Sequence, residues 1–102
     1  MADMVSILKT AVENKASDIH LVIGKPPMMR MHGEIAPIPG LKPISAEETK
    51  ALIYSVLFEE QRMRLEQTWE LDASFGVSSL ARFRINAFMQ ANGMEAVMRV
   101  IP

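Results

Sequence analysis

The chain has 102 residues, of which 49% are hydrophobic and 23% are charged, and its formal net charge is −1. This composition is typical of one small folded domain and excludes a disordered chain, while the near-neutral charge gives no general attraction to nucleic acid or membranes. Cysteine is absent, which excludes disulfides and thiolate metal sites and suits a cytoplasmic protein, and no apolar run is long enough to span a bilayer.

The first half of the chain predicts one helix followed by short strands. Apolar residues recur at helical spacing in the first segment, and Asp3 is suitably placed to cap its start. The pattern then changes to alternation, which is typical of strands. The expected elements are a helix over residues 4–12, strands over residues 18–23, 28–32 and 33–35, and a proline-rich loop over residues 37–43.

The second half predicts two helices followed by three strands. Ser45 and Glu48 have the spacing of a capping box, so a helix is expected to start there. A second helix is expected over residues 59–68, with Phe58, Leu65 and Trp69 facing inward. Strands are expected over residues 70–75, 80–90 and 94–101. The order α-β-β-β-α-α-β-β-β favours an α+β fold, an antiparallel sheet with helices packed on one face and the other face free for a partner.

The last two strands gather three arginines on one face. Asn92-Gly93 between two alternating runs is a strong signal for a two-residue hairpin turn. Such a turn makes the numbers of paired residues add to 185, which places Asn86 opposite Arg99 and Arg84 diagonal to it. Because side chains alternate along strands, one face would carry Arg82, Arg84, Asn86 and Arg99.

Two interpretations of these arginines remain open. In one, Asp72 on the preceding strand lies near Arg84 and forms an ordinary ion pair on a solvated face. In the other, the arginines form an anion site, because like charges at this spacing repel unless something negative compensates them. Planar guanidiniums suit phosphate through paired N–H donors, so the anion would be a phosphate group.

Other candidate sites in the sequence are weaker. Asp18 and His20 share a strand face, with Arg30 and His32 on a neighbouring strand, but this spacing supplies no assured third metal ligand, and no metal site is expected. No glycine-rich phosphate-binding motif occurs, so the chain cannot hold a nucleotide by such a loop. Phe88 is the single aromatic residue expected on the arginine side, which disfavours single-stranded nucleic acid as a partner.

Five blocks of the sequence together resemble a known family. In chain order they are residues 16–21 (ASDIHL), 24–33 (GKPPMMRMHG), 72–75 (DASF), 81–88 (ARFRINAF) and 99–102 (RVIP). They resemble the N-terminal domain of the type IV pilus retraction ATPases, within the wider superfamily of pilus and secretion ATPases. The blocks cover nearly the whole chain, and their combination is far more specific than any one of them.

The resemblance implies a fold, an activity and partners. It implies a PAS-like N-terminal domain over residues 1–102, in a cytoplasmic homohexamer at the inner-membrane base of the pilus machine. Such a motor hydrolyses ATP with Mg²⁺ on a RecA-like C-terminal domain and drives pilus retraction and twitching motility. Arg84 and Arg99 would act as arginine fingers toward the γ-phosphate, and Arg82 would also contact the nucleotide. The partners would be the protein's own and neighbouring RecA-like domains and the inner-membrane platform protein.

The resemblance also sets a limit and leaves an alternative. The printed sequence stops at Pro102 without an ATPase domain, so these residues alone are not expected to hydrolyse ATP or to hold a cofactor. The alternative is a PAS-like interaction or adaptor module of a pilus or secretion system that makes no direct contact with nucleotide.

Overall fold

The computed structural model describes residues 3–102 and confirms the expected order of elements. Within these residues the chain forms three helices and six strands. They are α1 (Met4–Glu13), β1 (Asp18–Leu21), β2 (Met28–Met31), β3 (Glu34–Pro37), α2 (Ala46–Tyr54), α3 (Glu59–Thr68), β4 (Glu70–Val77), β5 (Ala81–Gln90) and β6 (Gly93–Ile101). The fold is therefore α+β, as the pattern of segments predicts.

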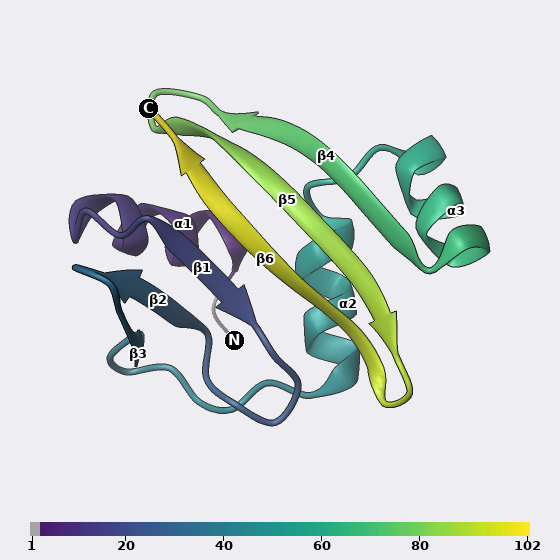
Figure 1. The fold of residues 1–102 in the computed structure, drawn as a ribbon, viewed down its shortest axis with the longest axis horizontal. Helices are drawn as coiled ribbons and strands as arrows, with labels where there is room; N and C mark the ends of the chain where they lie inside the picture. Colours follow the sequence, from purple (N-terminus) through teal and green to yellow (C-terminus); the bar gives the residue numbers. More distant parts are fainter. Residues whose placement is uncertain (1–2) are drawn as a thin grey trace.

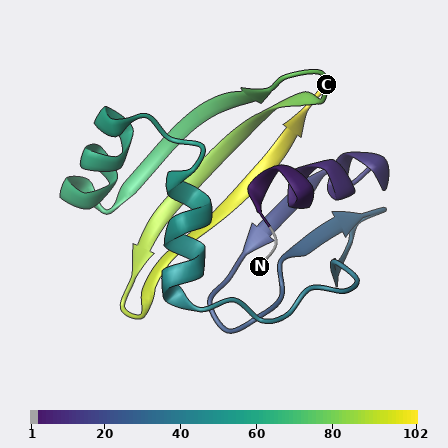
Figure 2. The same cartoon turned by 180° about the vertical axis from the view of Figure 1, so that it is seen from behind.

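The six strands form one antiparallel sheet in the order β3-β2-β1-β6-β5-β4 (Figure 1). Helices α1 and α2 both lie behind the sheet, as the view from the other side shows in Figure 2. Helix α3 lies at the far edge, beside β4. One broad face of the sheet is therefore left without a helix.

Local sequence signals explain where the helices begin. The Asp3 side chain accepts a hydrogen bond from the backbone N–H of Ser6, at 2.8 Å, and so caps α1. The capping box of α2 is present in both directions: Glu48 N–H donates to the Ser45 hydroxyl at 3.2 Å, and Ser45 N–H donates to the Glu48 carboxylate at 3.0 Å.

Three residues around α3 were expected to face inward, and this prediction is wrong for two of them. Leu65 is fully buried, but Phe58 is 78% exposed and Trp69 is 62% exposed. Phe58 is the N-cap of α3, and Trp69 is its C-cap, with a left-handed backbone at φ 68°. The helical period describes residues inside a helix, and both aromatics lie outside it, so the spacing did not predict their direction.

The core lies between the sheet and helices α1 and α2. Its largest fully buried side chains come from every layer: Ile7 and Leu8 of α1, Ile19 and Leu21 of β1, Ile53 of α2, Leu65 of α3, Phe83 and Ile85 of β5, and Met98 of β6. The apolar stripes of the helices are used for this packing. Across residues 3–102, no helix combines the length and the apolar character needed to cross a membrane.

The hairpin between β5 and β6 has a different register from the predicted one. Gln90 pairs with Gly93, so the two turn residues are Ala91 and Asn92, and Arg84 lies directly opposite Arg99. The predicted turn at Asn92-Gly93 is therefore wrong. In the observed turn neither Ala91 nor Asn92 has a positive φ, and a turn without positive φ at its two central residues favours glycine at its fourth position, which Gly93 occupies. The shift is two residues, so every side chain keeps its predicted face.

The turn with two left-handed residues occurs instead between β2 and β3. His32 and Gly33 have φ values of 52° and 81°, and Met31 pairs with Glu34 across them. These dihedrals are typical of the tight hairpin turn that asparagine-glycine usually makes. The third strand is therefore Glu34–Pro37, rather than residues 33–35 as expected from the sequence.

Candidate functional site

Charged side chains form one row across the sheet face that carries no helix. In the register of the sheet, Arg30 on β2 lies opposite Asp18 on β1, Asp18 lies opposite Arg99 on β6, and Arg99 lies opposite Arg84 on β5. Each alternates along its strand with buried core residues, so the row points away from α1 and α2. We call the arginine face the following six residues: Asp18, Arg30, Asp72, Arg82, Arg84 and Arg99.

Arg84 is held by Asp72 through two parallel hydrogen bonds. Its Nε donates to Asp72 Oδ1 at 3.0 Å, and its Nη2 donates to Oδ2 at 2.7 Å. The predicted ion pair between these residues is confirmed. Hydrogen bonding from Arg84 lowers the pKa of Asp72, and the same contact raises the pKa of Arg84. The Arg84 side chain is nevertheless 65% exposed, so this contact lies in solvent.

Arg99 has a looser partner than Arg84. Its Nε lies 3.5 Å from Asp18 Oδ1, while Arg30 Nε lies 3.8 Å from the other oxygen of the same carboxylate. The Asp18 side chain is only 13% exposed, whereas that of Arg99 is 73% exposed. Arg30 is fixed further by a hydrogen bond from its Nη1 to the carbonyl of Gly33, at 2.9 Å. Asp18 therefore lies at the centre of the row, and Arg99 is the more exposed of its two cations.

Arg82 lies at the margin of this arrangement. It pairs with Gly76 on β4 and Ile101 on β6, and its Nη2 donates a long hydrogen bond of 3.4 Å to the Ser74 hydroxyl. A Cβ at Gly76 would lie 3.1 Å from Arg82 Nη1, so glycine at this position leaves room for the guanidinium. Arg82 also borders a groove of about 570 Å³ on the α1 and α2 side of β4.

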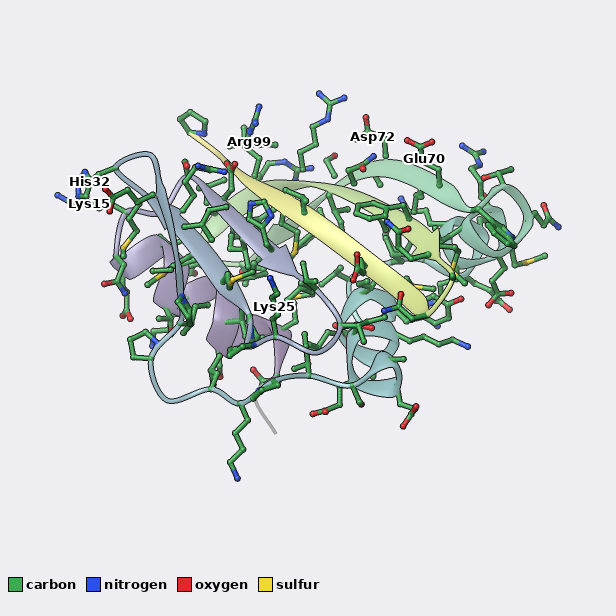
Figure 3. The ribbon with its side chains drawn as sticks, turned by 60° about the horizontal axis from the view of Figure 1, so that its bottom comes forward. Lys15, Lys25, His32, Glu70, Asp72 and Arg99 are labelled. Atoms are coloured by element: carbon green, nitrogen blue, oxygen red, sulfur yellow. The ribbon has the colours of Figure 1, made fainter. Side chains whose placement is uncertain are left out.

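The arginine face has the charge and the exposure to receive an anion. Its four guanidiniums and two carboxylates give it a net charge of +2. A shallow depression of about 390 Å³ lies beside Arg84 and Asp72. Figure 3 shows Arg99, Asp72 and Glu70 pointing to the same side of the sheet, away from α1 and α2. Of the predicted arginines, Arg84 and Arg99 lie directly opposite each other on neighbouring strands, each held by a different carboxylate, and Arg82 lies two residues before Arg84.

The sequence did not indicate that Asp18 and Arg30 belong to this group. The sequence places Asp18 on one strand and Arg30 on a neighbouring one, but the pairing of β1 with β6 joins segments from opposite ends of the chain. No local turn signal specifies such a pairing. The available signal was the alternation around Asp18, which puts a carboxylate on the solvent face of a strand whose neighbours are apolar.

The weak metal candidates are not brought together. Asp18 is engaged by two arginines, and His32 lies apart in the turn between β2 and β3 (Figure 3). Burial lowers the pKa of His20, and its Nε2 has no hydrogen-bond partner among the described residues. Residues 3–102 contain no group of three or more histidine, aspartate or glutamate side chains suited to a metal ion.

Phe88 has acidic neighbours on both sides. It pairs with Glu70 on β4 and with Glu95 on β6. A platform for single-stranded nucleic acid needs cations around its aromatic ring, because the phosphate backbone follows the bases. These carboxylates make Phe88 a poor platform of that kind.

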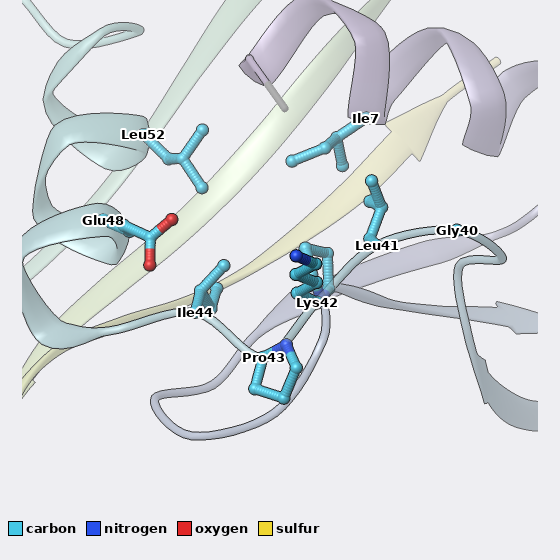
Figure 4. Close-up of a pocket in the computed structure, with 9 residues that line it drawn as sticks. Ile7, Gly40, Leu41, Lys42, Pro43, Ile44, Glu48 and Leu52 are labelled. Carbon is cyan, nitrogen blue, oxygen red and sulfur yellow. The ribbon is translucent and has the colours of Figure 1, made fainter. Parts of the chain in front are cut away.

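A third hollow lies between α1, α2 and the loop before α2 (Figure 4). It has a volume of about 360 Å³, and its walls are mostly apolar. Lys42 and Glu48 supply its charged groups, but the Glu48 carboxylate already accepts the capping hydrogen bond from Ser45. The hollow therefore offers little polar recognition, and the arginine face is the better candidate site.

Comparisons with known proteins identify relatives along almost the whole chain. No family model matches it. It is 42% identical over 100 residues to the type IV pilus retraction ATPase PilT of Pseudomonas aeruginosa, covering 98% of this chain and 29% of that protein. It is 37% identical over 99 residues to a twitching motility protein of Neisseria gonorrhoeae, covering 97% and 26%. The chain thus spans less than a third of the length of these relatives.

Solved structures show the same likeness. The crystal structure of the pilus retraction motor PilT with bound ADP matches all of this chain and 30% of its own chain, with a TM-score of 0.93 and 39% identity. The ATPase DotB of Legionella pneumophila matches 99% of this chain and 30% of its own with a TM-score of 0.81, and at 23% identity it supports the fold alone. The fold and the sequence agree, and the chain belongs to the N-terminal domains of the PilT-type pilus ATPases.

Proposed function

We propose that this domain is the arginine-bearing, mobile part of a hexameric ATP-driven motor that retracts type IV pili. Residues 1–102 would form one domain, followed in the full-length protein by a RecA-like ATPase domain that binds ATP and Mg²⁺. Arg84 and Arg99 would reach the terminal phosphates of that nucleotide, and Arg82 would contribute from the margin. The relatives support this assignment, since PilT is a pilus retraction ATPase and its crystal structure contains ADP.

The single observation that carries the proposal is the direct pairing of Arg84 with Arg99. The two residues lie directly opposite each other on neighbouring strands, and both side chains are more than half exposed on the sheet face without helices. Two exposed cations carried by directly paired residues both attract an anion, so an anion that bridges them would be favoured. A triphosphate has the charge and the paired oxygens for such a contact.

The chemical role of the arginines would be to stabilise charge during phosphoryl transfer. Negative charge spreads over the oxygens of the transferred group, and cations held around it lower the barrier. Residues 3–102 contain no acidic cluster suited to a metal, so Mg²⁺ would be held by the ATPase domain. Closure of this domain over ATP and opening after hydrolysis would convert the reaction into movement between domains.

The partners follow from the same proposal. The arginine face would contact ATPase domains of its own or a neighbouring subunit in the hexamer. The motor would lie in the cytoplasm at the inner-membrane base of the pilus machine and act on the platform protein there. Residues 1–102 alone would not hydrolyse ATP, because the sequence has no phosphate-binding loop.

Substitution of the paired arginines tests the proposal. In the full-length protein, Arg84→Ala and Arg99→Ala should each lower the ATPase rate by about a hundred-fold, because each removes a cation from the transferred phosphate. Arg64→Ala is the matched control, since Arg64 is an exposed arginine on α3, away from the arginine face. Sedimentation should show an intact hexamer for all three variants. Wild-type turnover in both Arg84→Ala and Arg99→Ala would refute the finger role.

An adaptor function without nucleotide contact is the second candidate. The observation that favours it is the bidentate bond between Arg84 and Asp72, which satisfies the guanidinium without any phosphate. In that case the alanine variants would keep normal ATP hydrolysis and nucleotide affinity but would lose contact with a protein partner. Nucleotide titration of the same variants therefore separates the two functions.

A further inference from the structure

We propose that Asp72 is the resting counter-ion of Arg84, which Arg84 exchanges for phosphate oxygens when nucleotide binds. The inference rests on the proposed function, because it concerns the same arginine and the same class of ligand. It makes Asp72 a positioning residue: the carboxylate sets the affinity for nucleotide by holding Arg84, without touching the nucleotide itself.

The contact resembles the one that would replace it. Arg84 presents Nε and Nη2 to the two oxygens of Asp72, at 3.0 and 2.7 Å. The same pair of parallel donors fits two oxygens of a phosphate group. One guanidinium edge cannot serve both anions at once, so binding of phosphate through this edge requires the release of Asp72.

The exchange needs no rearrangement of the core. The Asp72 and Arg84 side chains are both at least half exposed, and their strands carry the pair on the face without helices. The depression of about 390 Å³ beside them is open to an incoming ligand. A swing of the Arg84 side chain is therefore sufficient, and such rotamer changes are fast for exposed residues.

Within the described part of the chain, Asp72 differs from Asp18 in having a single arginine partner. When Arg99 leaves Asp18, that carboxylate still has Arg30 at 3.8 Å. When Arg84 leaves Asp72, no other arginine or lysine of the described chain lies within ion-pair distance of it. The hydrogen bonds from Arg84 lower the pKa of Asp72, so this carboxylate is charged at neutral pH. Freeing Arg84 for phosphate therefore costs its two hydrogen bonds to a charged carboxylate, and Asp72 is the source of that cost.

Glu70 provides a matched control for the charge of Asp72. It lies two residues earlier on β4 and points to the same side of the sheet (Figure 3). Within residues 3–102 its carboxylate forms no ion pair, and its partners across the sheet do not include Arg84. Glu70→Gln therefore removes one negative charge from the same strand face without freeing an arginine.

The test uses the full-length protein and measures the affinity for a non-hydrolysable ATP analogue by calorimetry, together with KM and kcat for ATP. Asp72→Asn should tighten binding of the ATP analogue and lower KM by about three-fold, with kcat unchanged, because freeing Arg84 strengthens ground-state and transition-state binding alike. Asp72→Glu, which keeps the carboxylate, should have a wild-type nucleotide affinity and KM, and Glu70→Gln should change both quantities little. Circular dichroism confirms that each variant is folded.

Each outcome separates the counter-ion from the finger role. Unchanged or weaker binding of the ATP analogue in Asp72→Asn, alongside an impaired Arg84→Ala, overturns the counter-ion role and leaves the proposed function intact. In an Arg84→Ala background, Asp72→Asn should have no further effect, and a persisting gain would mean direct repulsion of phosphate rather than exchange. Full activity of Arg84→Ala would instead refute the proposed function itself, and the counter-ion role with it.

Discussion

Gly93 shows how one missing side chain permits the packing of a hairpin against a helix. Its φ is +137°, and a Cβ there would lie 2.8 Å from Ile23 Cδ1 and 3.1 Å from the Cβ of Ala46, the first residue of α2. Gly93→Ala should therefore destabilise the domain by about 2–4 kcal/mol, through backbone strain and overpacking together. Urea unfolding of the 102-residue chain measures this loss.

Gly33→Ala is the control for the backbone part of that effect. Gly33 also has a positive φ, of +81°, but a Cβ there would meet no atom of the described chain within 4 Å. This variant should lose only about 1–2 kcal/mol, the cost of a left-handed residue. Equal losses in the two variants would show that the contact with Ile23 and Ala46 does not contribute.

At the residue scale, the sequence predicted which face each arginine occupies but not its neighbour. Alternation fixes the face, and a shift of two residues leaves the face unchanged. The turn chemistry was ambiguous, because a glycine after asparagine serves either as the second turn residue or as the residue after the turn. Arg84 was therefore expected diagonal to Arg99, whereas the two are directly opposite.

Between α2 and α3, one tyrosine joins the two helices. Its hydroxyl donates to the Glu66 carboxylate, and its backbone carbonyl accepts two hydrogen bonds from Arg62, at 3.1 and 2.7 Å. Burial and the contact with Glu66 raise the pKa of Tyr54 to about 12. Because Tyr54 is the only tyrosine of the 102 residues, the phenolate absorbance should report a single ionisation near pH 12.

The sign of the accompanying stability change follows from the raised pKa. Tyr54 is neutral in the folded state up to a higher pH than in the unfolded chain, where it ionises near pH 10. Its contribution to stability is thus complete below pH 10 and is lost as the pH rises toward 12. Glu66→Gln should move the ionisation part of the way back toward pH 10. A midpoint at 10 in the unmodified chain would contradict the contact.

At the element scale, local signals predicted the helices and strands but not how all of them pair. The capping box and alternating runs gave all nine elements in the right order. The pairing of β1 with β6 joins the two ends of the chain at the centre of the sheet, and no turn connects them. This pairing brings Asp18 beside Arg99, so the part of the site that was missed depends on the one contact that local patterns do not encode.

The whole molecule places its packed core and its exposed charges on the two opposite faces of one sheet. The face toward α1 and α2 carries the core, and the face without helices carries exposed charges that contribute little to folding. Neighbouring residues on a single strand therefore have opposite roles. This arrangement lets the arginine face change its contacts while the core stays packed, as the proposed release of Arg84 from Asp72 requires.

Two adjacent residues of β5 test this separation. Ile85 is fully buried, so Ile85→Ala should destabilise the domain by about 2–5 kcal/mol through lost burial and a cavity. Arg84→Ala, one residue away on the opposite face, should leave the midpoint of urea unfolding almost unchanged, because its contact with Asp72 lies in solvent. If Arg84→Ala unfolded the domain as readily as Ile85→Ala, the arginine face would have to be regarded as part of the folding core. The loss of ATPase activity expected for Arg84→Ala could then no longer be assigned to a missing contact with phosphate.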